Sequence, residues 1–529
     1  MGFSPHLGSD SGPHRREGRR LTQRTVVWCV SLCVLFSLAV VGIWYGVRAV
    51  TPQPLPLGTG TNPASAVTVQ QAISLPASGR EPVIGVVATF GDDAEGSAWR
   101  LNAQGARVAQ YRLALGNSSV KVLYANDKGT EQGAREAVEK LSSEGALGIV
   151  LASRGEHLRG ATAAAKERNV AVIEAYDRVD AGDGVWSFAL DPEREKQVYT
   201  TAIRSLAGAS STGSSQQLDG VRTILLDAGE GSAPDLPYTN RVQVSADEDS
   251  IKDTLKELTR LLGDKSSGSS PVLVLTGSAS TQAKVLRSLQ RAGITSPVIA
   301  GEEALTEPFM RLLLENGGSL TDNIRVVGRV QARAAALSAD DAGRASSAFV
   351  STVERMKNDS SLKDLSGEQS FSKSAAWADA PSHNALLAFA YATSQVREYT
   401  PEAVRRVLGT LRLDAKDSTV AYPLDFSSSY AAGGQVGLLY PTAEASMIQG
   451  GSSSTDAVNP PVWMLRTFTS ESRDEPFHTE PTVQSQPITP RLSGITSSPS
   501  TSGAHDLSIL ENTLCAFSLN LKSITGAMN

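Results

Sequence analysis

From residue 82 onward, short apolar runs alternate with amphipathic helical stretches, and this alternation constrains the fold more than any other feature of the chain. The first half holds four apolar runs that suit buried parallel strands. They cover residues 83–88, 120–124, 146–151 and 170–173, with helical stretches near 97–115, 130–144 and 156–168. Strands that alternate with helices predict βαβ units, and therefore a parallel sheet with helices on its faces.

The same pattern begins again in the second half, after a Ser- and Gly-rich break at residues 208–220. The strand-like runs cover residues 221–226, 242–244, 272–275, 298–300 and 324–327, with helices near 192–207, 251–262 and 280–292. Residues 164–173 and 289–299 share one plan, in which a helix end is followed by a capping residue and a strand. Two similar α/β lobes in one chain predict a cleft between them.

An uncharged apolar run of 23 residues, 25–47, precedes the patterned region. It is long enough to cross a hydrocarbon core of about 30 Å as a helix. Five arginines precede it: Arg15, Arg16, Arg19, Arg20 and Arg24. Only Arg48 follows closely, so the positive-inside bias predicts a single-pass cell-membrane protein with a cytoplasmic N-terminus and an extracytoplasmic main domain. A cleaved signal peptide is the other interpretation, although its apolar core usually spans only about 7–15 residues.

Composition divides the chain into five segments. We expect a basic cytoplasmic stub at 1–24, a transmembrane helix at 25–47, a Pro-, Gly- and Ser-rich linker at 48–80, a two-lobed domain at 81–445 and a low-complexity, disordered tail at 446–529. Within the domain, lobe one is expected at about 81–190 and 335–445, and lobe two at about 191–334. The fold class is thus α/β, with two Rossmann-like lobes.

Composition also excludes several classes of function. The net charge of −6 argues against a nucleic-acid partner, which requires a basic face. Cys29, Cys33 and Cys515 all lie outside the patterned region, and His157 and His383 are its only histidines. No disulfide and no His/Cys metal site is therefore expected there. The domain has neither a Gly-x-Ser-x-Gly elbow nor a cysteine nucleophile, so we expect no enzyme and no cofactor.

Five segments have the order and spacing of a known family, although no single motif among them is specific. They are 83–88 with the glycine-containing turn after it, 145–153, 286–301, 383–390 and 424–426, of which 286–301 is the closest match. With these segments, residues 81–445 resemble the type I periplasmic-binding-protein fold. The resemblance is greatest to the proteins that bind branched-chain amino acids for ABC transporters. It implies two lobes that close on a small ligand.

Ligands of open α/β sheets lie beyond the carboxyl ends of the strands, so the candidate ligand-binding residues follow the predicted strands. They are Ser153, Arg154, Ala175 and Tyr176 in lobe one, and Asp227, Ser278, Glu302 and Glu303 in lobe two. The resemblance implies that Glu303 holds a ligand ammonium by a charge-assisted bond, while hydroxyls and backbone N–H groups of lobe one take the ligand carboxylate. Other interpretations stay open: Glu302 and Glu303 also suit a helix start, and Arg154 also suits a solvated loop.

Two departures from the family separate the functional hypotheses. Tyr176, Asp177 and Arg178 stand where relatives carry a Ser/Thr-rich turn, and the stretch between Leu226 and Val242 is too short for a full helix. The leading hypothesis is a membrane-anchored solute-binding protein that passes a small polar ligand, such as an amino acid, to an ABC permease. The rival is an extracellular sensor or scaffold with a degenerate fold, which acts through protein partners or a membrane signalling partner.

Overall fold

The computed structural model describes residues 71–76, 80–91, 94–208, 218, 220–229, 233–263, 270–442, 447–448 and 457–467. The expected cytoplasmic stub, the apolar run at 25–47 and most of the linker lie outside these residues. Within the described ranges, no helix has the length and apolar character needed to cross a membrane.

The sheet of lobe one is parallel throughout, in the order β2-β1-β3-β4-β5. Its strands are β1 (Val83–Ala88), β2 (Lys121–Asn126), β3 (Gly148–Leu151), β4 (Ala171–Glu174) and β5 (Val185–Ser187). The first four were predicted. The sequence analysis missed β5, because its three residues, Val-Trp-Ser, do not form an apolar run.

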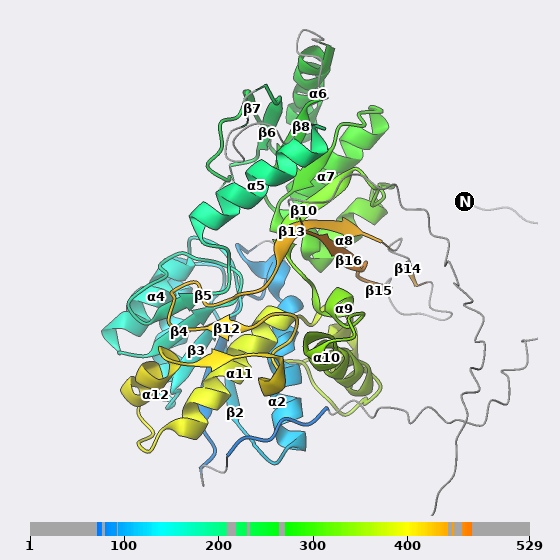
Figure 1. Cartoon of the computed structure of the whole chain (residues 1–529). Helices are drawn as coiled ribbons and strands as arrows, with labels where there is room; N and C mark the ends of the chain where they lie inside the picture. The colour runs from blue at the N-terminus through cyan, green and yellow to red at the C-terminus, as the bar shows by residue number, and fades with distance from the viewer. Residues whose placement is uncertain are drawn as a thin grey trace, which may run out of the picture. The chain divides into compact units, whose positions relative to one another are not determined.

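Helices cover both faces of this sheet (Figure 1). Along β1, Ile84 and Val86 pack on the side of α2 (Gly105–Leu115) and α11 (Ala380–Gln395). Val87 points to the opposite face, against α3 (Glu131–Ser143) and α4 (Leu158–Glu167). All three side chains are fully buried, so β1 is apolar at consecutive positions rather than at alternate ones.

The sheet of lobe two repeats the winding of lobe one and then extends it with β13 (Val436–Pro441) and β16 (Trp463–Arg466), in the order β16-β13-β10-β9-β8-β6-β7. Its parallel strands are β6 (Thr223–Asp227), β7 (Asn240–Gln243), β8 (Val272–Leu275), β9 (Val298–Ala300) and β10 (Ile324–Arg329). In both lobes the second strand along the chain lies at one edge, followed by the first, third, fourth and fifth. The predicted echo between the two halves is therefore confirmed.

One face of the lobe-two sheet packs on α5 (Pro192–Leu206), and the other on α6 (Glu248–Gly263), α7 (Ala279–Arg291) and α8 (Glu307–Glu315). The remaining helices are α9 (Ala332–Ala335), α10 (Asp341–Lys357) and α12 (Pro401–Leu408), and the remaining strands form two short pairs. These are β11 (Arg412–Leu413) with β12 (Leu424–Asp425), and β14 (Met447–Ile448) with β15 (Ala457–Val458).

The predicted C-terminal boundaries are wrong. Strand β13 (Val436–Pro441) falls in the range assigned to lobe one, yet it pairs antiparallel with β10 of lobe two. Strand β16 (Trp463–Arg466) falls in the predicted disordered tail, yet it pairs with β13, and Trp463 is only 5% exposed. An edge strand needs only a few apolar residues, so the average composition of 446–529 hides it.

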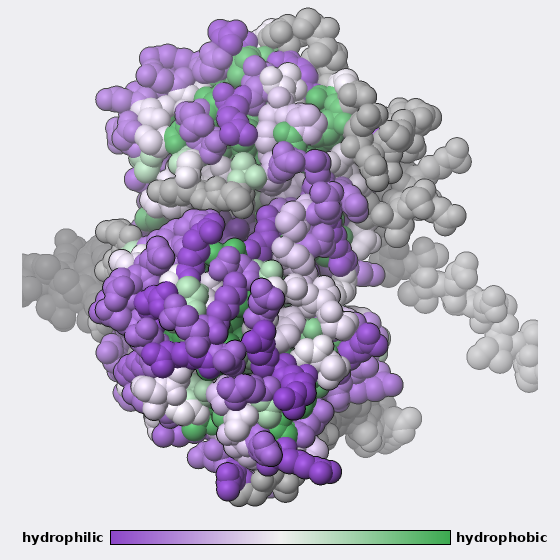
Figure 2. Space-filling model, turned by 90° about the vertical axis from the view of Figure 1, so that its left-hand side faces the viewer, coloured by the Kyte–Doolittle hydropathy of each residue, from purple (hydrophilic) through white to green (hydrophobic). Residues whose placement is uncertain are grey.

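The face of the molecule that Figure 2 draws is mainly hydrophilic over its described residues. Apolar residues are scattered among the hydrophilic ones. Among the described residues, the large hydrophobic side chain exposed to solvent is that of Leu337, which is 72% exposed. A single exposed leucine is ordinary for a globular protein and marks no docking surface.

Candidate functional site

A small cavity lies between the lobes, beyond the carboxyl ends of the two sheets. Its volume is about 70 Å³, below the roughly 300–1,000 Å³ of typical ligand pockets. Its walls combine aromatic rings with polar side chains: Trp99, Tyr176, Phe188 and Tyr422 among the rings, and Asn102, Glu302, Arg329, Gln331 and Asp379 among the polar groups. Ala175 and Leu305 line it as well. A ligand of more than a few atoms therefore needs the lobes to part.

Three of the predicted residues meet at the cleft, but they bind one another. Arg154 follows β3 of lobe one, and its Nη1 lies 2.6 Å from Glu302 Oε2 of lobe two. Its Nε lies 3.4 Å from Glu303 Oε1. Burial lowers the pKa of the Arg154 guanidinium, but Glu303 and Glu302 more than offset this, so its pKa is raised. The protein's own cation thus pairs with Glu302 and with Glu303, the carboxylate that the resemblance assigns to a ligand ammonium.

The aromatic wall contains one residue that was predicted and one that was missed. The predicted Tyr176 stacks on Trp99 with ring centroids 4.5 Å apart and an interplanar angle of 24°. The Arg154 guanidinium lies 5.9 Å from the centre of the Trp99 ring. Trp99 lies in a stretch that looked helical, and no sequence pattern distinguished it from a core residue.

Asp379, also missed, places a carboxylate in the wall of lobe one. It is the N-cap of α11, and its Oδ1 accepts hydrogen bonds from Ser382 N at 3.2 Å, Ser382 Oγ at 2.9 Å and Tyr176 Oη at 3.0 Å. Burial raises the pKa of the Asp379 carboxyl to about 7, although hydrogen bonds from Ser382, Tyr176 and Asn102 oppose the rise. An aspartate followed by Ala-Pro is a recognisable helix start, but that signal does not say that the cap faces a cleft.

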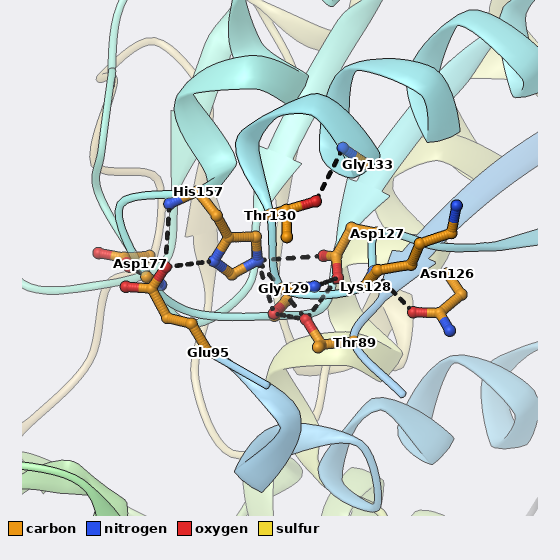
Figure 3. A network of polar contacts seen from close by, with 12 residues as sticks. Thr89, Glu95, Asn126, Asp127, Lys128, Gly129, Thr130, Gly133, His157 and Asp177 are labelled. Atoms are coloured by element: carbon orange, nitrogen blue, oxygen red, sulfur yellow. Dashed lines mark hydrogen bonds and ion pairs between the residues drawn. The ribbon is translucent and has the colours of Figure 1, made fainter. Parts of the chain in front are cut away.

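Ser153 does not line the cavity; it is buried and contacts Thr89 and His157. These two residues belong to the polar network drawn in Figure 3. Ser153 Oγ is 2.5 Å from Thr89 Oγ1 and 3.4 Å from His157 Nε2. His157 Nδ1 lies 3.0 Å from Glu95 Oε2, and Nε2 lies 3.2 Å from Asp127 Oδ2.

The Ser153–His157 pair is not an activated nucleophile. Burial lowers the pKa of His157, but the hydrogen bonds to Asp127 and Glu95 outweigh this and raise it. Each ring nitrogen faces a carboxylate, so the imidazolium form, with a proton on both nitrogens, satisfies both contacts. In that form the ring has no lone pair with which to accept a serine proton, and its contacts are those of a structural network.

The network instead fixes the loop that carries Trp99. Glu95 accepts hydrogen bonds from the backbone N–H groups of Glu156 and His157, at 3.1 and 3.3 Å. Gly96 next to it has φ of 86°, and a Cβ there would lie 2.1 Å from Ser153 Oγ. Only glycine allows this approach of the loop to α4, and the approach places Trp99 in the cavity wall.

The other two candidates have structural partners and do not line the cavity. Asp227 accepts hydrogen bonds from Arg241 Nη1 at 3.3 Å, Gln243 Nε2 at 3.1 Å and Gly229 N at 2.9 Å, which tie β6 to β7. Ser278 caps α7, where its Oγ accepts a hydrogen bond from Thr281 N at 3.3 Å. Within the described ranges, no cluster of three or more His, Cys, Asp or Glu side chains could hold a metal ion.

One arginine joins the connections between the lobes. The described chain passes between the two sheets near residues 188–191, 330–331 and 432–435. Arg329 lies at the second passage, and it donates to Phe188 O at 2.7 Å, Ala432 O at 2.7 Å and Gly433 O at 3.0 Å. Its guanidinium therefore ties the first and third connections to the second, beside which it lies, and these bonds use its Nε and both Nη atoms.

Comparison with known proteins gives the fold and no closer relationship. No protein-family model matches the sequence. No curated protein matches it either. Among solved structures, an extracellular ligand-binding receptor from Rhodopseudomonas palustris HaA2 is similar, with a TM-score of 0.50 and 12% identity over 69% of this chain and 98% of that chain.

Two other solved structures are similar as well. A leucine-binding protein from Thermotoga maritima MSB8 has a TM-score of 0.49 and 15% identity, over 72% of this chain and 99% of that chain. A branched-chain amino acid transporter substrate-binding protein from Streptococcus pneumoniae, in complex with isoleucine, has a TM-score of 0.47 and 13% identity, over 68% of this chain and all of that chain (100%). With the strand order of the two lobes, the likeness to the receptor shows that the domain has the type I periplasmic-binding-protein fold. Sequence identities of 12–15% support a shared fold, but they do not show that the ligand or the role is shared.

Proposed function

We propose that this chain is an extracytoplasmic solute-binding protein that holds a small polar ligand between its two lobes. The observation that carries the proposal is the cavity beyond the carboxyl ends of two identically wound sheets, with walls from both lobes and from the connections between them. This is where ligands of doubly wound sheets bind. Convergent polar groups among apolar and aromatic side chains are typical of small-molecule sites.

The cellular setting forms part of the same proposal. The apolar run at 25–47 and the arginines before it support attachment to the cell membrane, with the main domain outside. The resemblance to binding proteins of ABC transporters favours a permease as the partner that receives the ligand. No enzymatic step is part of the proposal.

One contact favours a second candidate, a sensor or scaffold that acts through protein partners. Arg154 already neutralises Glu302 and Glu303 across the cleft, and only a small cavity remains beside them. A protein whose own side chain joins its lobes needs no solute to do so. The two candidates differ in one property, namely whether a solute stabilises the domain.

A thermal-shift screen of the purified full chain against amino acids and other small polar metabolites separates them. A ligand at about 100 times its dissociation constant stabilises the fold by about 2.7 kcal/mol, which raises the melting temperature by several degrees. Leu305→Trp fills the cavity and should abolish the shift, whereas Leu337→Trp at an exposed position should leave it unchanged. A folded chain that responds to no compound supports the sensor or scaffold instead.

A further inference from the structure

We infer that the cleft selects a small protonated amine rather than a zwitterionic amino acid, and that Asp379 and Asn102 of lobe one hold its ammonium group. The inference rests on the proposed function and names the ligand class for the same cavity. It also moves the ammonium from Glu303 of lobe two, where the resemblance places it, to the opposite wall.

The polar atoms of the cavity wall that can still form hydrogen bonds to a ligand are acceptor oxygens. Asp379 accepts hydrogen bonds from neutral donors alone among its described partners: Tyr176 Oη, Ser382 N and Ser382 Oγ reach Oδ1, and the Asn102 side chain adds a further bond. The Asn102 side chain lines the cavity, is 6% exposed, and its Oδ1 has no hydrogen-bond partner among the described residues. A buried carbonyl oxygen without a donor is costly. An ammonium group offers three donors and no acceptor, so it matches these two side chains.

The cations of the cavity are already engaged, so a ligand carboxylate lacks a partner. Arg154 binds Glu302 and Glu303, and Arg329 donates to three backbone carbonyls. The Gln331 amide donates to Arg329 O at 3.1 Å. Ser153, which the resemblance offers to a carboxylate, is fully buried and does not line the cavity. A ligand carboxylate would instead lie in the same small cavity as the carboxylates of Asp379 and Glu302, which repel a further negative charge.

Aromatic rings complete the match to a cation. Trp99 and Tyr176 stack on each other, and Phe188 meets Tyr422 edge to face, with centroids 6.5 Å apart and an interplanar angle of 82°. All four rings line the cavity. Their faces attract cations, and several rings around one pocket are a common arrangement for binding ammonium groups.

The charge state of Asp379 supports the assignment and supplies a second readout. Its carboxyl has a pKa of about 7, so it gains its negative charge as the pH rises through neutrality. Between about pH 6 and pH 8 its ionised fraction rises roughly tenfold. The affinity for an amine should rise by a similar factor, because aliphatic amines stay protonated throughout this range.

Calorimetric titration of the purified full chain with three related probes tests the inference. The probes are 3-methylbutylamine, 4-methylpentanoate and leucine, which carry the ammonium, the carboxylate and both. Methylammonium and putrescine extend the amine set. We expect an amine to bind at about pH 8, at least tenfold more tightly than leucine, and 4-methylpentanoate not to bind.

Asp379→Asn should weaken amine binding at least tenfold and remove its pH dependence. Asparagine also caps helices well, so the variant should fold, and circular dichroism checks this. Asp249→Asn, at an exposed position in α6, is the matched control and should bind as the wild type does.

Leucine or 4-methylpentanoate binding without amine binding would overturn the inference and leave the proposed solute-binding function intact. Amine binding that Asp379→Asn does not weaken would also overturn it, because the ammonium would then lie elsewhere. If no amine binds, the inference falls. The wider thermal-shift screen then decides the proposed function on its own.

Discussion

The two walls of the cleft differ in how their carboxylates are compensated. On lobe two, Glu302 and Glu303 face a guanidinium of the same chain, with Arg154 Nη1 2.6 Å from Glu302 Oε2. On lobe one, the recorded hydrogen bonds to Asp379 come from neutral groups. The lobe-two carboxylates, which Arg154 neutralises, hold the lobes together. The Asp379 carboxylate has no cation beside it among the described partners, so its charge can attract a ligand cation. Acidic residues at the cleft thus serve cohesion on one side and recognition on the other.

The largest effect is expected from removing the compensating cation. Arg154→Gln leaves two neighbouring carboxylates facing the cleft without a partner, and breaking a buried ion pair costs about 3–5 kcal/mol. The three side chains are 19–31% exposed, so we expect a smaller loss in free energy of unfolding, about 2–3 kcal/mol at neutral pH. Urea denaturation measures it.

The matched control for Arg154 is Arg135, a half-buried arginine of α3 that pairs with the exposed Glu167. Arg135→Gln should cost much less than Arg154→Gln, because solvent screens a surface ion pair. Equal losses for the two variants would show that the contact between the lobes contributes nothing special to stability.

A third carboxyl extends the comparison, because it is more isolated than Asp379. Glu174 at the end of β4 is fully buried, and neither of its carboxyl oxygens has a hydrogen-bond partner among the described residues. Burial raises its pKa to about 8, with Asp177 and Asp180 adding to the rise. The folded state therefore binds more protons than the unfolded state between about pH 4.5 and pH 8, and stability falls as the pH rises through this window.

Glu174→Gln should remove that loss and stabilise the domain by about 2 kcal/mol near pH 8, with little change near pH 4.5. Melting curves of the variant and the wild type across this range check the result. A variant that is less stable than the wild type at about pH 8 would contradict a neutral, isolated Glu174.

A smaller effect is expected from the buried cation of lobe one. The pKa of His157 is raised, chiefly because the hydrogen bonds to Asp127 and Glu95 outweigh desolvation. Its contribution to stability is therefore complete below about pH 6.5 and is lost as the pH rises through the raised folded value. His157→Gln should cost about 1 kcal/mol more at acidic than at alkaline pH, as measured by urea denaturation. An equal cost at both ends would show that the imidazole is neutral.

The smallest effect on stability is expected for Asp379→Asn. The cap of α11 persists, because asparagine also accepts the bond from Ser382 N. The pKa of Asp379 is raised to about 7, so its ionised form is costly above neutrality and the variant removes that cost. Unlike Glu174, Asp379 accepts three hydrogen bonds at Oδ1, which the amide weakens, so the net gain should be less than about 1 kcal/mol. Thermal melts near pH 8 measure this. A strong destabilisation would place Asp379 among the residues that hold the fold, as Arg154 does, and would remove the contrast between the two walls.

The sequence predicted the strands and helices of both lobes more accurately than it predicted the site. Runs such as Val83-Ile84-Gly85-Val86-Val87-Ala88 carry their period locally, so their order gave the parallel sheets. Glu303 and Arg154 were each placed at the cleft for sound reasons, yet neither position in the chain indicates that they meet, 149 residues apart. Trp99 and Asp379 were missed because one resembles a core residue and the other a helix cap.

By itself, the sequence determined the α/β alternation, the repeated winding of two lobes and the edge of each sheet at which side chains converge, because these follow from local periodicity and chirality. Only the tertiary structure decided which charges at that edge are satisfied by one another and which are left for a ligand. It also decided that β13 and β16 complete lobe two. Both outcomes depend on groups that lie far apart along the chain, and a local pattern carries no information about distant partners.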